Sequence, residues 1–438
     1  MFGDRERLER QRAEQDRAVA TLLRQEVIPY SRFHRDRLSG STVGSVADLA
    51  RLPTMSLEDV GDPASLVLRP TAEQIAAAGS FDLKSRLFVA KLANKVGALN
   101  RSVIDPLYKP VHWVMAESIP IAYSARDLDR LAEIGRRWLE AAGVQVADTI
   151  VSLLPPGAHL AYWQLLLGAR VGGLSAIGLD PRTSSADVVA LQPTVLAGSM
   201  AGLARLAGEG APPMPEVRTI IAVGDPVDPR LAAIRQLSGR RDVAVVTAYA
   251  PPGVRALWAQ CRGGTGLHTW PATEIIELDP SPHGEIVWTG IGWYGSAFVR
   301  LRTGVAGTLV EGMCPACGRT TARLVELRAA SRHDEAPAPA ARPAVEPPPP
   351  EEDEDWPDFV EVLGGHPDVA AWQVEMRTVG DEDELIVYLA PVIDGHPGRL
   401  VRALDQQLAA TQYVVLDGST VEQRIARHGG EQILDLRT

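Results

Sequence analysis

Cysteine and long apolar runs are scarce in this sequence, and positive charge is in deficit. Its 438 residues include only three cysteines, and pairing them as disulfides would leave one over. No apolar run reaches the roughly 18 to 20 residues that a membrane-spanning helix requires. Lys and Arg (44) are outnumbered by Asp and Glu (55), and the net charge of −11 disfavours binding to a nucleic-acid backbone. Because the chain also shows no secretory signal, we expect a cytoplasmic protein that binds neither nucleic acid nor a membrane.

Composition divides the chain into two parts joined by a linker. With 45% hydrophobic residues, a chain of this length can build one large core and a smaller one. Between Glu335 and Pro357 the residues are mainly Ala, Pro and acids, including Pro347–Pro350 and the acidic run Glu351–Asp355. This stretch has no apolar periodicity and is typical of an extended, solvated tether, with a docking motif as the alternative. We predict an N-terminal domain over 1–332, a linker over 333–357 and a C-terminal domain over 358–438.

Apolar runs alternate with amphipathic segments before the linker. Ser124 is a suitable N-cap for a helix that Gly143 would end. A buried strand is predicted at 149–154 and further strands at 174–179, 194–197, 219–223 and 243–247, and their alternation with helices is typical of a doubly wound, mostly parallel sheet. In the segments 285–289 and 297–302 the apolar residues recur at a shorter interval than in a helix, which predicts an antiparallel subdomain. After the linker, a small α+β domain is predicted, with helices at 359–363 and 400–408, strands at 372–377 and 385–389, and a final strand.

The three cysteines and one histidine form the strongest candidate site in the sequence. Cys261 is followed by His268, and Cys314 and Cys317 stand in a Cys-x2-Cys turn rich in glycine and proline. Three thiolates and an imidazole are the donor set of a closed, tetrahedral zinc site. The alternatives are a chance trio of cysteines and, for the histidine, a hydrogen-bonded core residue. We predict a structural zinc ion bound by Cys261, His268, Cys314 and Cys317.

The segments around these ligands also resemble a known family. Their succession is similar to that in the phenylacetate–CoA ligase branch of the adenylate-forming enzymes: Gln260–Cys261, Gly266–Trp270, Gly284–Val287, Arg300–Gly304 and Cys314–Arg319. Four further segments extend the resemblance toward both ends of the chain: Tyr30–His34, Leu52–Thr54, Asp368–Val369 and Ile433–Arg437. The resemblance implies an α/β fold with a large adenylate-forming domain built on a doubly wound mixed sheet, a zinc-binding subdomain at about 255–325 and a small α+β C-terminal lid. It also implies an AMP-forming acyl- or aryl-CoA ligase that uses ATP, Mg²⁺ and CoA and often dimerises.

The motifs that would bind ATP depart from the family pattern. The stretch in place of the glycine-rich phosphate loop, His112–Pro120, has no glycine and carries the acid Glu117. The family's Tyr-Gly-x-Thr-Glu motif, whose acid holds Mg²⁺, reads Tyr-Ala-Pro-Pro-Gly at 249–253. The Asp that would hold the ribose is replaced by Val305, and each hydrogen bond left unmade would cost on the order of 1 to 3 kcal/mol.

The C-terminal part departs in the same way. The hairpin that would line the CoA tunnel is replaced by the tether, and the hinge is only faintly visible as Arg332–Asp334. No lysine follows Lys109, so the family's near-terminal lysine is missing, and an arginine is not equivalent to it. The segment Gly224–Pro226 is similar to the family's adenine-packing turn, although an ordinary strand-to-helix turn explains it equally well. We expect ATP, Mg²⁺ and CoA to bind weakly or not at all.

These losses favour a catalytically degenerate homologue, a pseudoenzyme that acts as a binding or scaffolding protein. The alternatives are an ATP-independent or partner-completed acyl-transfer enzyme on the same scaffold, and an active ligase with divergent motifs. A catalytic paralogue, a carrier protein, a small carboxylate or acyl ligand, or a second copy of the chain are the partners we consider. No nucleophile–base pair can be assigned from the sequence. The candidates for the ancestral pocket are His112, Glu117, His159, Gly224, Asp225, Pro226, Tyr249 and Arg302.

Overall fold

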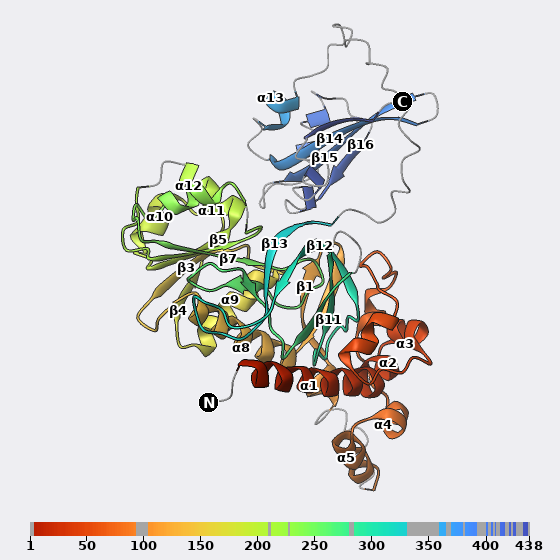
Figure 1. Ribbon diagram of the computed structural model, residues 1–438. Helices are drawn as coiled ribbons and strands as arrows, with labels where there is room; N and C mark the ends of the chain where they lie inside the picture. Colours follow the sequence, from red (N-terminus) through yellow and green to blue (C-terminus); the bar gives the residue numbers. More distant parts are fainter. Residues whose placement is uncertain are drawn as a thin grey trace, which may run out of the picture. The chain divides into compact units, whose positions relative to one another are not determined.

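The chain separates into two compact units, residues 1–336 and 337–438 (Figure 1). The computed structural model describes residues 4–92, 104–208, 212–226, 228–279, 284–330, 359–364, 369–379, 382–391, 400–401, 404–405, 408, 412–416, 420–421, 424–425 and 432–436. The linker predicted at 333–357 and the hinge predicted at 332–334 lie outside these residues. None of the described helices is long and apolar enough to cross a membrane.

The first unit is built on one mixed sheet of eleven strands. Five neighbouring strands are parallel, in the order β4-β3-β5-β6-β7: β3 Thr149–Leu153, β4 Ser175–Gly178, β5 Val195–Ser199, β6 Thr219–Val223 and β7 Ala244–Tyr249. Six antiparallel strands continue the sheet in the order β8-β9-β13-β12-β11-β10: β8 Trp258–Gln260, β9 Leu267–His268, β10 Glu274–Leu278, β11 Glu285–Gly290, β12 Leu301–Val310 and β13 Arg323–Ala329. The predicted α/β class is therefore confirmed.

The predicted mixed sheet is confirmed, but its antiparallel part is longer than the sequence predicts, and one predicted strand has other bounds. The antiparallel part begins where the chain leaves β7 through a turn, in which the Val254 N–H donates to the Pro251 carbonyl, and returns as β8. A connection this short can only join antiparallel neighbours. The strand predicted at 297–302 begins only at Leu301. Arg300 adopts a positive φ of 55°, which interrupts an extended strand, and the Ala297 N–H donates to the Leu66 carbonyl in the N-terminal segment.

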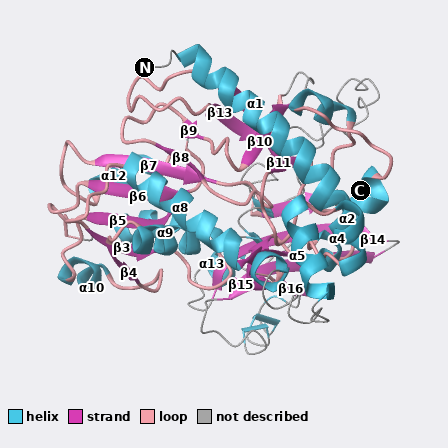
Figure 2. Ribbon diagram, turned by 90° about the horizontal axis from the view of Figure 1, so that it is seen from below, coloured by secondary structure: helices cyan, strands magenta, loops and turns pink. Residues whose placement is uncertain are grey.

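Helices cover both faces of the parallel half. Ile150 packs on one face with α8 (Ala125–Ala141) and α9 (Leu160–Val171), which run side by side in Figure 2. Its neighbour Val151 packs on the other face, among the helices α10 Ser185–Ala190, α11 Met200–Gly208 and α12 Leu231–Gln236. The alternation follows from the two-residue period of a strand. It gives the doubly wound arrangement that the sequence predicts.

Helix α8 begins and ends where the sequence predicts. The Ser124 side chain accepts a hydrogen bond from the Asp127 N–H, the Asp127 carboxylate accepts one from the Ser124 N–H, and Gly143 adopts a φ of 82° just after the helix. Gly135 and Gly168 let α8 and α9 cross in contact. A Cβ on Gly135 would lie 2.1 Å from the Gln164 carbonyl oxygen, so the crossing requires glycine there.

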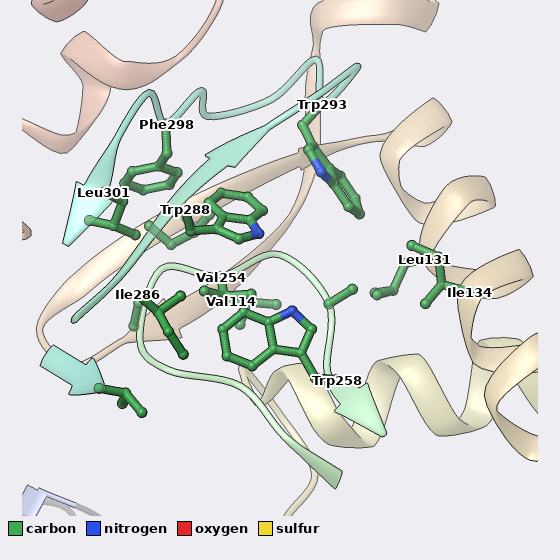
Figure 3. Packing of buried hydrophobic residues seen from close by; sticks show 14 of the residues in the cluster. Val114, Leu131, Ile134, Val254, Trp258, Ile286, Trp288, Trp293, Phe298 and Leu301 are labelled. Atoms are coloured by element: carbon green, nitrogen blue, oxygen red, sulfur yellow. The ribbon is translucent and has the colours of Figure 1, made fainter. Parts of the chain in front are cut away.

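The antiparallel half and the hairpin of β1 (Pro110–Ala116) and β2 (Ile119–Ser124) enclose the largest core. Trp258, Trp288 and Phe298 are fully buried in it and lie close together in Figure 3. A second core joins the N-terminal helices to β10 and to the loop before β12. These elements are α1 Asp4–Leu22, a π-helical turn Leu23–Val27, α2 Ile28–Tyr30, α3 Arg32–Leu38, the 3₁₀ helices Val46–Arg51 and Pro63–Leu66, α4 Ala72–Ala78, α5 Phe81–Leu92 and α7 Asp105–Tyr108.

Glu26, in the π-helical turn, gives a test of this N-terminal packing. Burial raises its pKa to about 7, against smaller opposing effects of Arg126 and Arg130. Because the folded state then holds a proton that the unfolded state releases from about pH 4.5 upward, stability should fall between pH 4.5 and 7. We expect Glu26→Gln to remove this slope and to be more stable than the parent at pH 8, by on the order of 3 kcal/mol.

Urea unfolding between pH 4.5 and 8 measures this difference. The exposed Glu14 lies on the preceding helix, and Glu14→Gln serves as the control, with a pH profile parallel to that of the parent. Equal pH slopes for Glu26→Gln and the parent would show that Glu26 ionises as freely in the fold as in the unfolded chain.

The second unit contains a four-stranded sheet in the order β16-β15-β14-β17. Its strands and its first helix are β14 Val369–Val379, β15 Glu382–Pro391, β16 Gln412–Val415, β17 Ile433–Leu436 and α13 Phe359–Gly364. β14 and β15 are antiparallel, while β16 and β17 join the edges in parallel. The sequence did not predict β16, a run of only four residues. The described residues of the helix predicted at 400–408 are helical, and Leu400, Leu404 and Leu408 are buried against the sheet.

Candidate functional site

The sheet brings the three cysteines and His268 together. Cys261 follows β8, His268 lies in β9, and Cys314 and Cys317 stand in the turn between β12 and β13. Because β9 pairs with both β8 and β13, these segments meet at one end of the three strands. One donor atom from each of the four residues lies within 4.8 Å of the others. The predicted ligand set is thus one cluster in space.

The Cys-x2-Cys turn is folded to present both sulfurs. The Cys314 N–H donates to the Arg319 carbonyl at 2.7 Å, and Gly318, with a φ of 71°, donates back to Cys314 at 2.9 Å. Burial alone would raise the pKa of Cys314. Hydrogen bonds from the Thr265 hydroxyl and from the turn's own N–H groups outweigh burial and lower that pKa to about 6. A thiol stabilised as thiolate is prepared for a metal ion.

His268 is oriented by its second ring nitrogen. Nδ1 lies 2.8 Å from the Thr321 hydroxyl, while Nε2 faces the Cys317 sulfur at 3.5 Å. With Nδ1–H as donor to Thr321, Nε2 offers its lone pair to the centre of the cluster. Burial, with help from Arg319 and Arg323, lowers the pKa of His268 to about 4, so the ring is neutral at pH 7.

The spacing of the donors fits zinc. The sulfurs of Cys261 and Cys314 are 3.9 Å apart, and two sulfurs on a tetrahedral zinc ion with 2.3 Å bonds are about 3.8 Å apart. All three cysteines are free thiols rather than disulfides. Cys261, Cys314 and His268 are buried, and Cys317 is partly exposed. Such an arrangement could hold a metal in a structural role.

The β1–β2 hairpin, which the resemblance matches to the family's phosphate loop, has a tight turn. Ala116 pairs with Ile119, so only Glu117 and Ser118 connect β1 to β2. Glu117 is exposed and adopts a positive φ of 54°. A triphosphate is normally cradled by several successive N–H groups of a longer glycine-rich loop. Two residues do not supply such a cradle, and the exposed carboxylate would repel phosphate.

Packing fills the two positions that the resemblance matches to the family's other nucleotide-binding acids. At Gly253, matched to the metal-binding acid, a Cβ would lie 2.6 Å from the Leu301 side chain. Val305, matched to the ribose-binding Asp, is buried in the largest core. The candidate Arg302 pairs with Glu285 at 2.7 Å, and the same carboxylate accepts from the Gly304 N–H at 3.0 Å.

The remaining candidates form two local contacts. Tyr249 lies at the end of β7, and its pKa is raised to about 12 by burial and by Asp225, which follows Gly224 in the turn after β6. Gly224 donates to the Ala248 carbonyl, and the half-buried Pro226 follows in the same turn.

His112 lies on β1, with its ring centroid 4.4 Å from that of Trp163 on α9. Burial lowers the His112 pKa. His159 is exposed at the N-cap of α9. The described contacts include no hydrogen-bonded nucleophile–base pair among these residues.

A cavity beside the cysteine cluster was not predicted from the sequence. Its volume is about 1010 Å³, and it lies between α8 and the segments 268–273 and 318–321. The signal in the sequence that could have revealed it is the set of arginines on one face of α8: Arg126, Arg130 and Arg137. Charged residues on the outer face of a helix are common, so this set alone does not indicate a cavity.

In comparisons by sequence, the chain matches no protein-family model and no curated protein. Solved structures with a similar fold include 2-hydroxyisobutyryl-CoA ligase with 2-HIB-AMP and CoA in the thioesterification state. The TM-score is 0.58 at 16% identity, over 98% of this chain and 90% of that one. An open conformation of the same ligase gives 0.56 at 16% identity, over 94% and 89%. This chain therefore has the fold of acyl-CoA ligases of the adenylate-forming superfamily.

Proposed function

We propose that this protein is a catalytically degenerate homologue of the acyl- and aryl-CoA ligases, related to their phenylacetate–CoA ligase branch, that acts as a binding or scaffolding protein. The observation that carries the proposal is the two-residue turn Glu117–Ser118 between β1 and β2. In the ligases, the corresponding loop must surround phosphate with backbone N–H groups. A turn this short leaves the triphosphate without its main binding element.

The packing at Gly253 and Val305 supports the same conclusion. An acid at Gly253 would have to displace Leu301, and the side chain at position 305 lies inside the core rather than at a ligand. The phosphate, the metal and the ribose would each lose a contact. Because these contacts are made by different segments, one compensating change cannot restore them together.

We further propose that the cysteine cluster holds one structural zinc ion. Four protein ligands close the coordination shell, so no position remains for a reacting water. The ion would fasten β8 and β9 to the turn between β12 and β13. Its role would be to stabilise the antiparallel half of the sheet, which bound ATP and Mg²⁺ would not stabilise in this protein.

His112 favours one second candidate, an acyl-transfer enzyme that does not use ATP or is completed by a partner. Its Nε2 is buried without a hydrogen-bond partner among the described residues, and burial lowers its pKa, so the ring is a neutral base at pH 7. The nucleophile would have to come from a ligand, a carrier protein or a catalytic paralogue. A small carboxylate or acyl compound is the ligand that this scaffold would accept, and dimerisation is proposed on the resemblance alone.

Isothermal titration with ATP and Mg²⁺ tests the main proposal. We expect no binding at millimolar concentration, a limit that corresponds to roughly 4 kcal/mol of affinity. An active acyl-CoA ligase of the same fold, titrated in the same buffer, is the control. Micromolar binding of ATP, or pyrophosphate release with any carboxylic acid, would refute the pseudoenzyme proposal, and the release of pyrophosphate would point to an active ligase with divergent motifs.

A further inference from the structure

The cavity beside the cysteine cluster is an elongated groove along α8. Its lining follows one face of the helix from Ala125 to Ala141, which corresponds to about 24 Å at 1.5 Å per residue. Its volume of about 1010 Å³ is at the upper end of the usual range for small-molecule sites. It shares no lining residue with the ancestral pocket candidates, so it is a separate site.

Arginines dominate the charge of the groove. Its walls carry Arg126, Arg130, Arg137 and Arg319, against two acids, Asp129 and Glu133. This local excess stands out in a chain with a net charge of −11. Glu133 is already bound by Arg137 at 2.8 Å and by the neighbouring Arg136. An incoming anion would therefore meet more positive than negative charge.

The arginines are held in place by aromatic rings and backbone. Arg130 donates to the Ile291 carbonyl at 2.7 Å and lies over the Trp293 ring. Arg126 lies over the ring of Tyr294. A guanidinium has five N–H donors, so these contacts leave others for a ligand. Side chains fixed in this way lose little entropy when they bind an anion.

The floor of the groove is apolar and rigid. Trp270 lines it beside Trp138 and Ile134. The Trp270 indole donates to the Leu257 carbonyl at 2.7 Å, and its backbone N–H donates to the buried carboxylate of Glu274 at 2.6 Å. An indole fixed at both its ring nitrogen and its backbone presents a ready surface for a flat or aliphatic group.

The cysteine cluster forms one wall of the groove. His268 lines it, together with Gly318, Arg319 and Thr321 of the turn that carries Cys314 and Cys317. Thr321 is also the hydrogen-bond partner of His268. An interaction that holds the cysteine cluster in place therefore also holds this wall of the groove in place.

We propose that the groove along α8 binds an organic anion, with a carboxylate or phosphate group at the arginines and an apolar or aromatic body on Trp270. This inference goes beyond the proposed function and does not depend on it, because the groove is separate from the ancestral ATP site. It would give a chain without ATP chemistry a ligand-dependent role.

Fluorescence titration of the full chain with 8-anilinonaphthalene-1-sulfonate, an aromatic anion, tests the proposal. We expect Arg126→Gln/Arg137→Gln to weaken binding at least tenfold, because two cations leave the groove. The matched control is Arg182→Gln/Arg241→Gln, which removes the same charge from exposed sites elsewhere and should stay within twofold of the parent. Arg319→Gln, from the opposite wall, should also weaken binding, and a cooperative thermal unfolding transition shows that each variant has folded.

Three further measurements complete the test. The neutral dye N-phenyl-1-naphthylamine should bind far more weakly than the anion, and competition by phenylacetate against phenyl phosphate distinguishes the two anionic groups. Because α5 exposes Phe81 and Phe88, a Phe81→Ser/Phe88→Ser variant must keep the affinity of the parent. Equal affinities of the arginine pair variant and its control, tight binding of the neutral dye, or loss of binding in the α5 variant would each overturn the proposal.

Discussion

A Cys314→Ser/Cys317→Ser variant is expected to lose its metal entirely, whereas the parent should contain about one zinc ion per chain. Two of the four donors vanish, and a hydroxyl does not replace a thiolate as a zinc ligand. The free energy of binding a structural zinc ion contributes directly to folding. We therefore expect the variant also to unfold at a markedly lower temperature, with the antiparallel half of the sheet opening first.

Elemental analysis and thermal unfolding measure the two effects. Met313 precedes the first cysteine of the turn and is 54% exposed, so Met313→Ser is a matched control that should keep both metal and stability. Full metal content in the double cysteine variant would show that the cluster does not bind the ion. An unchanged melting temperature after metal loss would show that the ion does not hold the subdomain together.

Local signals in the sequence predicted the elements that depend on local chemistry. Ser124 and Gly143 mark the ends of α8 because capping involves only the first and last turns of a helix. The five strands of the parallel half were predicted within about two residues of their ends, because continuous apolar runs are typical of strands covered on both faces; the edge strand β4 is partly exposed. The sequence predicted antiparallel strands beyond β7 but not that they continue the same sheet, because strand pairing depends on residues far apart in the chain.

The candidate site likewise has features that local sequence signals indicate and features that depend on residues far apart in the chain. The three cysteines and His268 lie together as the sequence suggested and could hold a metal ion, since few residue types supply such donors and a Cys-x2-Cys turn brings two of them together by itself. The partner of Arg302, in contrast, is Glu285 on another strand, and no spacing in the sequence indicates this pair. The groove along α8 was missed for a similar reason. Its walls come from three segments that are unrelated in sequence.

The base of the β1–β2 hairpin is held by a buried ion pair. Arg255 and Asp127 are 1% and 0% exposed, with their charged atoms 3.3 Å apart. Arg255 also donates to the carbonyls of Ser296 and Ala122 and lies over the Tyr123 ring. Asp127 accepts from the N–H groups of Tyr294 and Gly295, both at 2.7 Å. The base of the hairpin is thus fastened to the fold by Asp127 of α8 and by Arg255, which precedes β8.

Arg255→Met should destabilise the first unit by about 3 to 5 kcal/mol, because it leaves the Asp127 carboxylate buried without its counter-charge. Chemical denaturation followed by tryptophan fluorescence measures the loss. Arg240→Met, which breaks the exposed pair with Asp242, is the control and should cost far less stability. Adding Asp127→Asn to Arg255→Met removes the buried charge while keeping an acceptor for the helix N-terminus, so the double variant should recover part of the loss. A loss for Arg255→Met no larger than that of the surface control would mean that the hairpin does not depend on this pair.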